Sequence, residues 1–212
     1  MTQTLLRNNK SQKYIIFDTE TEGLNLRYSR PWQLSFIEAK GKKIINSHDL
    51  FIDFEDLDLS DGAKQVTKFN EAAYNKKKKN KVEVLNFFDK FLYDPSYLIV
   101  GHNILGYDIY IHNVLRLACG KTSDYSYIDR IIDTNCLSKA YKEGIKSQGD
   151  VDSLILWQYK WLNFFKRGLK TNQAAMLKEF GVEFDKDKLH DGMYDVEKNF
   201  ELFHELINRI DI

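Results

Sequence analysis

The chain has 212 residues and a mass of 25.0 kDa, with 43% hydrophobic and 29% charged residues and equal numbers of acidic and basic side chains. A chain of this length can bury ~70% of the surface that it exposes when unfolded, so it can form a real hydrophobic core. This composition excludes a disordered chain, a collagen and a coiled coil, and no apolar run reaches the ~18 residues of a membrane span.

The N-terminal half of the chain predicts mainly strands. Three runs rich in apolar and β-branched residues predict strands at Tyr14–Asp18, Pro31–Ala39 and Lys43–Ile52. Gly41 lies between the last two runs and predicts a hairpin turn there. From Lys81 to Tyr93 apolar residues recur at helical spacing, and Asp94-Pro95 ends this predicted helix.

Strands and helices alternate in the rest of the chain. Tyr97–Gly101 is a continuous apolar run that predicts a buried strand, followed by a helix at about 107–118 and a short strand at about 128–133. In the helical C-terminal third, Thr171 is the expected N-cap of one helix and Gly181 the residue after its end. The last predicted helix carries an apolar stripe of Val196, Phe200, Phe203 and Ile207. We therefore expect the α/β class, with a central mixed five-stranded sheet covered by helices.

Two acidic residues end the first predicted strand, in the sequence FDTETEGL. Asp18 and Glu20 are two residues apart, so their side chains share one face of the extended chain while Thr19 points away. Two carboxylates that are buried close together need a cation, and hard oxygen ligands select Mg²⁺ or Mn²⁺. On its own, however, such a pair is more often an exposed surface feature than a metal site.

Two further places in the chain strengthen the metal interpretation. Asp108 begins a predicted helix directly after the buried strand, in GHNILGYD. Asp195 lies near the start of the last helix, and His190 precedes it by five residues in LHDGMYD. Four carboxylates and one histidine at predicted strand ends and helix starts are the set that a two-metal phosphodiesterase needs.

The order of these motifs resembles the DEDDh 3′–5′ exonucleases, the superfamily of the proofreading subunit of bacterial DNA polymerase, ribonuclease T and oligoribonuclease. The resemblance runs from about Tyr14 to about Ile207, which is nearly the whole chain. The first motif departs from the family at Glu22, where Thr or Ser is usual. The spacing from Asn103 to Asp108 is one residue longer than usual and is similar to proofreading domains that are fused to polymerases.

The third motif indicates the subclass. The tyrosine subclass of this superfamily has Tyr four residues before the last Asp, and that place is Asp191 here. The histidine subclass has His five residues before it, and His190 stands there. By this resemblance the chain is identified as a member of the histidine subclass.

The resemblance implies a ribonuclease H-like three-layer α/β/α fold and release of nucleoside 5′-monophosphates from 3′ ends. It implies that two Mg²⁺ ions, for which Mn²⁺ can substitute, are held by four carboxylates: Asp18, Glu20, Asp108 and Asp195. It also implies that His190 is the general base that deprotonates the attacking water, a role that suits imidazole because it titrates near neutral pH. These five residues form the expected catalytic set.

The resemblance further implies contacts to the terminal nucleotide from Glu20, Thr21, Leu24, Asn103 and His190. Leu24 is equally suited to packing in the core. Two neighbouring polar residues have structural interpretations: His102 closes a buried strand and is expected to be a hydrogen-bonded structural group, and Asp133 is expected to cap the following helix rather than bind metal.

Residues 139–170 are a helical, aromatic- and Lys-rich insertion within a single exonuclease domain, residues 1–212, by the same resemblance. This stretch includes Trp157, Tyr159, Lys160, Trp161, Phe164, Phe165, Lys166 and Arg167. Such side chains can stack single-stranded bases and neutralise phosphates. The favoured interpretation is an amphipathic helix that packs its aromatic residues on the core, and a docking surface for a polymerase or a second subunit is a third interpretation. The basic run Lys76–Lys79, together with Lys81, is interpreted as a phosphate-facing patch or a solvated helix start.

These observations favour a metal-dependent 3′–5′ exonuclease that acts on single-stranded DNA. An exoribonuclease or oligoribonuclease of the same superfamily is the alternative, because no side chain indicates a contact to a ribose 2′-hydroxyl. A catalytically idle module that binds nucleic acid or a polymerase is disfavoured, because such a module is expected to lose at least one of the five residues. We expect a nucleic-acid partner, no membrane, a DNA polymerase or a second copy as a further partner, and, from the two cysteines and the N-terminal segment, the cytoplasm.

Overall fold

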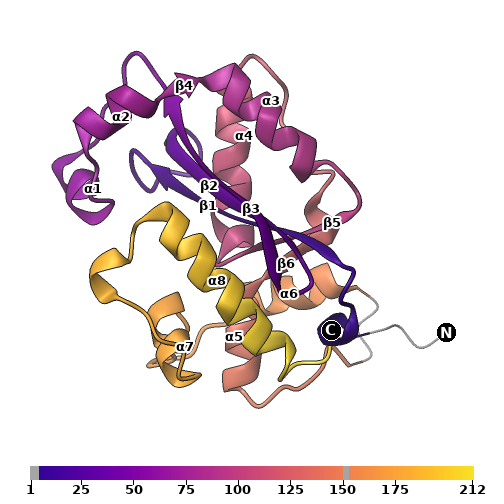
Figure 1. Ribbon diagram of the computed structural model, residues 1–212. Helices are drawn as coiled ribbons and strands as arrows, with labels where there is room; N and C mark the ends of the chain where they lie inside the picture. Colours follow the sequence, from indigo (N-terminus) through magenta and orange to yellow (C-terminus); the bar gives the residue numbers. More distant parts are fainter. Residues whose placement is uncertain (1–4, 150–152) are drawn as a thin grey trace.

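The computed structural model describes residues 5–149 and 153–212. Within these residues the chain forms a six-stranded sheet with the strand order β4-β3-β2-β1-β5-β6 (Figure 1). The strands are β1 Lys13–Thr21, β2 Pro31–Lys40, β3 Lys43–Asp53, β4 Lys79–Asn80, β5 Tyr97–Gly101 and β6 Ile131–Asp133. The sheet is mixed, as predicted: β1, β2 and β3 pair antiparallel, whereas β5 pairs parallel with β1 and β6 parallel with β5.

The predicted number of five strands is wrong by one. The additional strand, β4, is two residues long and pairs parallel with Ile52 and Asp53 of β3. A strand this short has no alternating pattern that a sequence can reveal. The strand expected at about 128–133 is also shorter than predicted, because Ile128–Arg130 forms a 3-10 turn and only Ile131–Asp133 pairs in the sheet.

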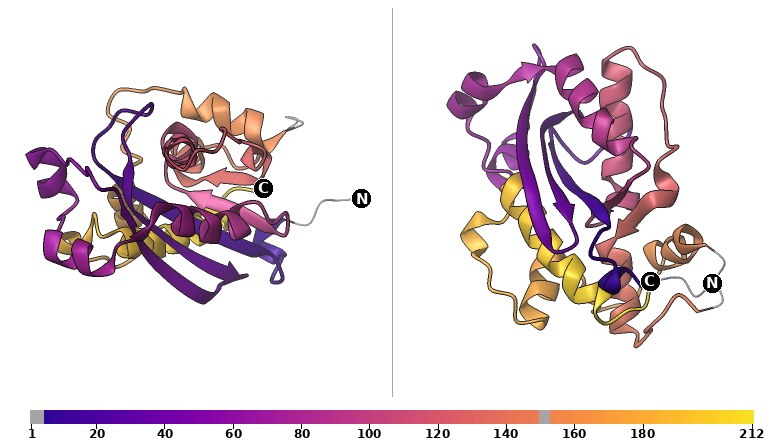
Figure 2. Two further views of the ribbon diagram at one scale, coloured as in Figure 1. Left: turned by 90° about the horizontal axis from the view of Figure 1, so that it is seen from above. Right: turned by 45° about the vertical axis from the view of Figure 1, so that its right-hand side comes forward.

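Helices cover both faces of the sheet (Figure 2). They are α1 Asp61–Val66, α2 Glu71–Lys77, α3 Lys81–Leu92, α4 Asp108–Ala118, α5 Thr134–Lys142, α6 Leu154–Leu162, α7 Gln173–Glu179 and α8 Gly192–Ile207. Helices α3 and α4 pack on one face, and α5 and α8 pack on the other. This is the three-layer arrangement that the resemblance implied.

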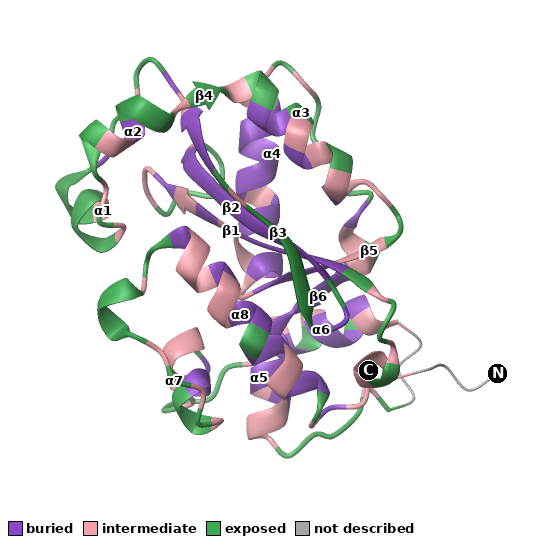
Figure 3. Cartoon of the chain, in the orientation of Figure 1, coloured by how far each residue is buried: buried purple, intermediate pink, exposed green. Residues whose placement is uncertain are grey.

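The alternation of side chains along β1 divides the core into two layers. Ile15 and Phe17 point toward α3 and α4, whereas Tyr14 and Ile16 point toward α8. All four are nearly completely buried, since helices cover both sides of this strand (Figure 3). The N-terminal half of β3 lies at the exposed margin of the sheet instead, which Figure 3 shows in green. Because β1 is an interior strand, the residues at its C-terminal end lie in the middle of the edge formed by the strand ends.

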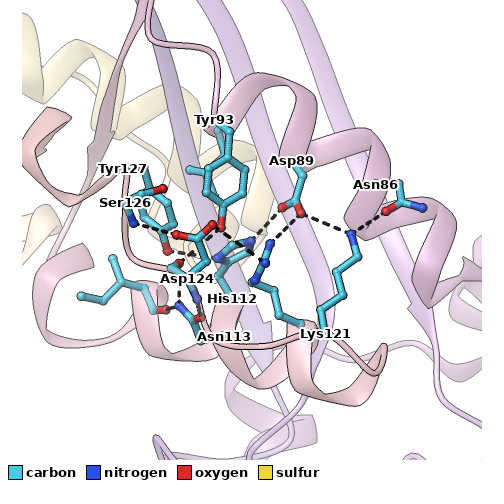
Figure 4. A network of polar contacts seen from close by, with 12 residues as sticks. Asn86, Asp89, Tyr93, His112, Asn113, Lys121, Asp124, Ser126 and Tyr127 are labelled. Atoms are coloured by element: carbon cyan, nitrogen blue, oxygen red, sulfur yellow. Dashed lines mark hydrogen bonds and ion pairs between the residues drawn. The ribbon is translucent and has the colours of Figure 1, made fainter.

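A buried polar network joins α3 to α4 (Figure 4). The imidazole of His112 is completely buried, with Nε2 2.9 Å from Asp89 Oδ1 and Nδ1 3.0 Å from the Tyr127 hydroxyl. Arg116 donates to the other oxygen of Asp89, at 3.0 Å. Burial lowers the pKa of His112, which favours the neutral ring, and the ring links two helices and the loop that follows α4.

The C-terminal third is helical, with one boundary that differs from the prediction. The N-cap of α7 is Asn172 rather than Thr171, because the Asn172 side chain accepts from the Ala175 N–H at 2.9 Å. Gly181 follows the end of α7 with φ of 69°, as predicted. The apolar stripe of α8 is buried at all four predicted positions.

The aromatic residues of the 139–170 stretch are divided between core and surface. Trp157 and Trp161 of α6 are buried against the core, in agreement with the packing interpretation. Phe165 lies beyond the end of α6 and is 87% exposed. Residues 150–152 of this stretch lie outside the described residues. Burial thus removes both tryptophans, but not Phe165, from the surface that a nucleic acid could reach.

Candidate active site

The first part of the site is the C-terminal end of β1, where Asp18 and Glu20 lie. The antiparallel register with β2 shifts between Glu20 and Thr21, so the regular pairing of β1 ends at this point. Burial, together with the negative charges of Asp108, Glu20 and Asp195, raises the pKa of Asp18 well above its ordinary value. Burial and the charge of Asp195 raise the pKa of Glu20 to about 8. Both carboxyls therefore face other acids in a place with little water.

Asp108 approaches these two residues from the first turn of α4. Its side chain is 3% exposed, and its Oδ1 accepts from the Thr19 N–H at 3.1 Å and from the Thr19 hydroxyl at 2.6 Å. Thr19 points away from the face of Asp18 and Glu20, as expected, and this orientation is what allows it to bind Asp108. Burial raises the pKa of Asp108 to about 7.

The turn before α4 is held by Asp133, at the end of β6. Its Oδ1 accepts from the N–H groups of Asn135 and Cys136 and thereby caps α5, as predicted. The same carboxylate accepts from the N–H groups of Asn103 and Leu105, each at 3.0 Å. Asp133 is thus fully engaged in structure, and it fixes the β5–α4 turn that leads to Asp108.

The third part of the site is the start of α8, which carries His190 and Asp195. Asp191 caps this helix by accepting from the Tyr194 N–H. His190 has φ of 66°, and its backbone N–H donates to Asp195 Oδ2 at 2.9 Å. Gly192 allows the helix to approach the sheet, since an added Cβ would lie 2.8 Å from the Ser35 hydroxyl of β2.

These three segments converge on one acidic cluster. Glu20, His190 and Asp195 each offer a ligand atom, and these atoms lie within 4.8 Å of one another. Asp195 Oδ1 is buried without a hydrogen-bond partner, and burial raises the pKa of Asp195 to about 6. A buried acceptor without a donor and several carboxyls that resist ionisation both fit a site completed by a divalent cation. The residues present therefore fit metal binding, and four carboxylates can supply its oxygen ligands.

A pocket of about 420 Å³ opens beside the cluster and contains residues that the sequence prediction had not placed in the site. Its walls are Asp18, His102, Asn172, Gln173, Ala174, Leu189, His190 and Asp195. His102 Nδ1 lies 2.9 Å from the Thr134 hydroxyl, which agrees with a hydrogen-bonded structural group. Burial lowers the pKa of His102 to about 4, so a neutral ring faces the pocket. Gln173 donates to the backbone oxygen of Asp195 at 3.0 Å.

Of the residues predicted to contact the terminal nucleotide, Glu20 and His190 lie in the cluster, whereas the others lie at the end of β1 or in the turns that follow β1 and β5: Thr21, Leu24 and Asn103. Leu24 is 88% exposed, so the core-packing alternative is wrong. The Thr21 side chain is buried, and its hydroxyl lies 2.6 Å from both the Gly23 carbonyl oxygen and the Tyr107 hydroxyl. Asn103 has φ of 61°, and its side chain covers Gly106, where an added Cβ would lie 2.7 Å from the Asn103 Oδ1.

Comparison with known proteins shows the family to which the chain belongs. The RNase T family model, described as an exonuclease, matches residues 15–203. The PolC-type DNA polymerase III of Latilactobacillus sakei is 33% identical over 147 residues, and that of Pediococcus pentosaceus is 32% identical over 130 residues. These alignments cover 68% and 61% of this chain but only 9% and 8% of the polymerases.

Solved structures share the fold at low sequence identity. E. coli exonuclease I in complex with a dA16 oligonucleotide has a TM-score of 0.72 and 18% identity, over 94% of this chain and 41% of that chain. An exonuclease I complex with SSB-Ct has a TM-score of 0.70 and 17% identity, over 94% of this chain and 42% of that chain. The chain thus spans less than half of exonuclease I.

Among the described residues, no helix is long and apolar enough to cross a membrane.

Proposed function

Because the chain belongs to the RNase T exonuclease family, in the DEDDh superfamily of metal-dependent nucleases, we propose that it removes nucleotides from the 3′ end of single-stranded DNA. The products are nucleoside 5′-monophosphates. The observation that carries this proposal is the convergence of β1, α4 and α8 on one cluster of four carboxyls and a histidine. Exonuclease I, which shares the fold, was solved with single-stranded oligonucleotides, and this supports the choice of substrate.

The superfamily uses divalent metal ions, and we propose Mg²⁺, with Mn²⁺ able to replace it. Asp18, Glu20, Asp108 and Asp195 would hold two ions. When bound, such ions acidify water and stabilise negative charge on the phosphate and the leaving oxygen. The raised pKa values of Glu20 and Asp108 support this assignment, because a nearby cation would restore the ionised form of each carboxyl.

His190 takes the proton of the attacking water in this proposal. Its backbone is fixed by the hydrogen bond to Asp195, and its imidazole lies beside Glu20 and Asp195 on the exposed side of the cluster. An exposed imidazole can pass the proton to solvent after each turnover, which a buried one such as His112 cannot do. Geometry therefore supports His190 rather than the buried histidines as the general base.

The terminal nucleotide would lie between the cluster and the β1–β2 loop. The base of this loop is rigid, because the Arg30 side chain donates to both oxygens of Glu22, at 2.5 and 2.9 Å. Leu24 projects from it into solvent, where it can pack against a base. Glu20, Thr21, Asn103 and His190 are the other proposed contacts to this nucleotide.

The next nucleotides would follow the segment between α6 and α7. Phe165 is exposed there, and Arg167 and Lys170 add exposed positive charge, while Lys166 pairs with Glu143 at 2.8 Å. This segment leads to Asn172, which lines the pocket beside the cluster. An exposed aromatic ring followed by cations suits the stacking and phosphate contacts of a single strand.

The test uses 5′-labelled single strands of DNA and of RNA, each with a free or a blocked 3′ end, resolved on a sequencing gel in Mg²⁺. We expect a ladder that shortens from the free 3′ end of DNA, and no ladder from a blocked end or in excess EDTA. A faster ladder on RNA would contradict the choice of DNA and indicate an exoribonuclease. No cleavage of any strand in Mg²⁺ or Mn²⁺ would contradict an exonuclease activity.

A further inference from the structure

Backbone strain in this protein is concentrated around the site. In the described part of the chain three residues other than glycine have positive φ: Lys68 at 52°, Asn103 at 61° and His190 at 66°. Asn103 and His190 belong to the proposed site. Such conformations persist where the surrounding structure enforces them, often at functional sites. The third residue, Lys68, is 122 positions before His190 and is not one of the proposed catalytic or substrate-binding residues.

Glycine would suit the backbone at position 68 better than lysine. Helix α1 ends at Val66, and Thr67 is its C-cap. Lys68 takes the left-handed position after the cap, and the next N–H, of Phe69, donates to the Lys64 carbonyl oxygen at 3.1 Å. Glycine is the usual residue in this kind of helix end, because it has no Cβ. Lysine occupies this position at a cost in backbone strain, and its side chain makes contacts that glycine cannot make.

The Lys68 side chain reaches the loop that precedes His190. Its Nζ donates to the backbone oxygen of Leu189 at 3.0 Å and also to that of Asp187. Leu189 is the immediate neighbour of His190 and lines the pocket beside the acidic cluster. One ammonium group therefore bridges two carbonyl groups at either side of Lys188.

This loop is a single 3-10 turn, Lys186–Lys188, which the Asp185 side chain caps by accepting from the Asp187 N–H at 2.9 Å, and its start is tied to α8 where the Asp185 N–H donates to the Tyr194 hydroxyl at 2.6 Å. The bond from the Leu189 N–H to the Lys186 oxygen is long, at 3.4 Å, and the residues from Asp185 to Leu189 are mostly exposed. His190 itself is exposed, and its backbone N–H donates to Asp195, which lies on its C-terminal side. On the N-terminal side, the Asp191 N–H donates to the Lys188 oxygen at 3.1 Å, and Lys68 adds a restraint by binding the oxygens of the two residues that flank Lys188.

We propose that Lys68 is a positioning residue: it clamps the backbone before His190 and so holds the imidazole beside Glu20 and Asp195. The inference rests on the proposed function, in which His190 is the general base. It adds that α1 and the turn after it, which carry none of the predicted site residues, act on turnover through this single side chain. The competing role for Lys68 is direct contact with a substrate phosphate.

The two roles differ in their kinetics. A clamp acts on the orientation of the base, so its loss lowers kcat and leaves KM nearly unchanged. A misplacement of the base by about 1 Å can reduce the rate by up to ~100-fold. A phosphate contact would instead raise KM. A clamp also has no further effect once the imidazole is gone, so the Lys68 and His190 substitutions must be non-additive.

The experiment compares Lys68→Ala, Lys68→Gly and Lys68→Arg with Lys64→Ala, an exposed lysine on α1 that serves as the matched control. We expect kcat to fall about 10- to 100-fold in the alanine and glycine variants, with KM within about twofold, and to recover substantially in the arginine variant. Lys68→Gly keeps the favoured backbone at the helix end, so it separates loss of the clamp from loss of folding. In a His190→Ala background, Lys68→Ala should cause no further loss.

Limited trypsin digestion gives a readout that does not depend on activity. Cleavage after Lys186 and Lys188, followed by mass spectrometry, should be faster in Lys68→Ala and Lys68→Gly than in the wild type, and unchanged in Lys64→Ala. If the wild type cleaves no nucleic acid, the proposed function fails, while faster digestion still supports the clamp. Unchanged digestion, a raised KM at constant kcat, or an additive loss with His190→Ala would overturn the inference.

Discussion

Replacement of Glu20 by glutamine should stabilise the metal-free protein at pH 8 while it destroys metal-dependent activity. In the folded state the pKa of Glu20 is raised to about 8, first by burial and then by the charge of Asp195. A carboxyl whose pKa is raised on folding binds its proton more tightly in the folded state. Its contribution to stability is therefore fully present below the unfolded-state value of 4.5 and is lost as the pH rises through about 8.

The size of the effect follows from the same two values. At about 1.4 kcal/mol for each pH unit, the difference between 4.5 and 8 sets an upper limit of roughly 4 kcal/mol at pH 8. The neighbouring carboxyls carry part of this electrostatic cost, because each of them can hold a proton in place of Glu20. We therefore expect Glu20→Gln to raise the free energy of unfolding by about 2–4 kcal/mol. For a protein of this size, that is an increase in Tm of about 5–15 °C.

The assay is thermal unfolding in EDTA at pH 5 and pH 8, with Glu183→Gln as an exposed control. The stabilisation by Glu20→Gln should be large at pH 8 and small at pH 5. Addition of Mg²⁺ should raise the Tm of the wild type more at pH 8 than at pH 5 and should have little effect on Glu20→Gln. A Glu20→Gln protein less stable than the wild type at pH 8 in EDTA would refute this reasoning.

Three further outcomes test other parts of the molecule. His190→Ala should lower kcat about 10²- to 10⁴-fold in single-turnover assays, and an unchanged rate would remove its role as base. Phe165→Ala and Arg167→Glu should each raise the KM for a 16-nucleotide strand about 3- to 10-fold and leave the KM for a dinucleotide unchanged. An equal rise in KM for the two substrates would exclude the proposed strand path. His112→Leu leaves the Tyr127 hydroxyl without a partner in the core, so the free energy of unfolding should fall by about 1–3 kcal/mol while metal binding stays intact. Loss of metal binding would contradict a purely structural network.

The sequence predicted the elements that pack against others and missed those that do not. β1 and β5 were found because strands covered on both faces are continuously apolar. Helices α1 and α2 were not predicted, since α1 buries no residue and α2 buries only Tyr74, which leaves no periodic pattern. The cap of α7 was displaced by one residue because Thr171 and Asn172 are both good caps, and only the side-chain geometry distinguishes them.

The site was predictable where it depends on chemistry and not where it depends on packing. The spacing of Asp18 and Glu20 at a strand end, and of His190 before Asp195, indicated a metal cluster, and the structure brings these residues together. Asn172 and Gln173 reach the pocket only because α7 packs against α8, a contact that no local pattern reveals. The exposure of Leu24 and of Phe165 likewise depends on which apolar residues the core accepts, which is decided by the assembled fold.

The most direct test of the carboxylate cluster is a count of bound Mn²⁺ by electron paramagnetic resonance in the wild type, Asp18→Ala and His190→Ala. The prediction is two bound ions in the wild type and in His190→Ala, and loss of binding in Asp18→Ala. Two ions retained by Asp18→Ala, or none bound by the folded wild type, would contradict the assignment of these carboxylates as the metal ligands of the nuclease.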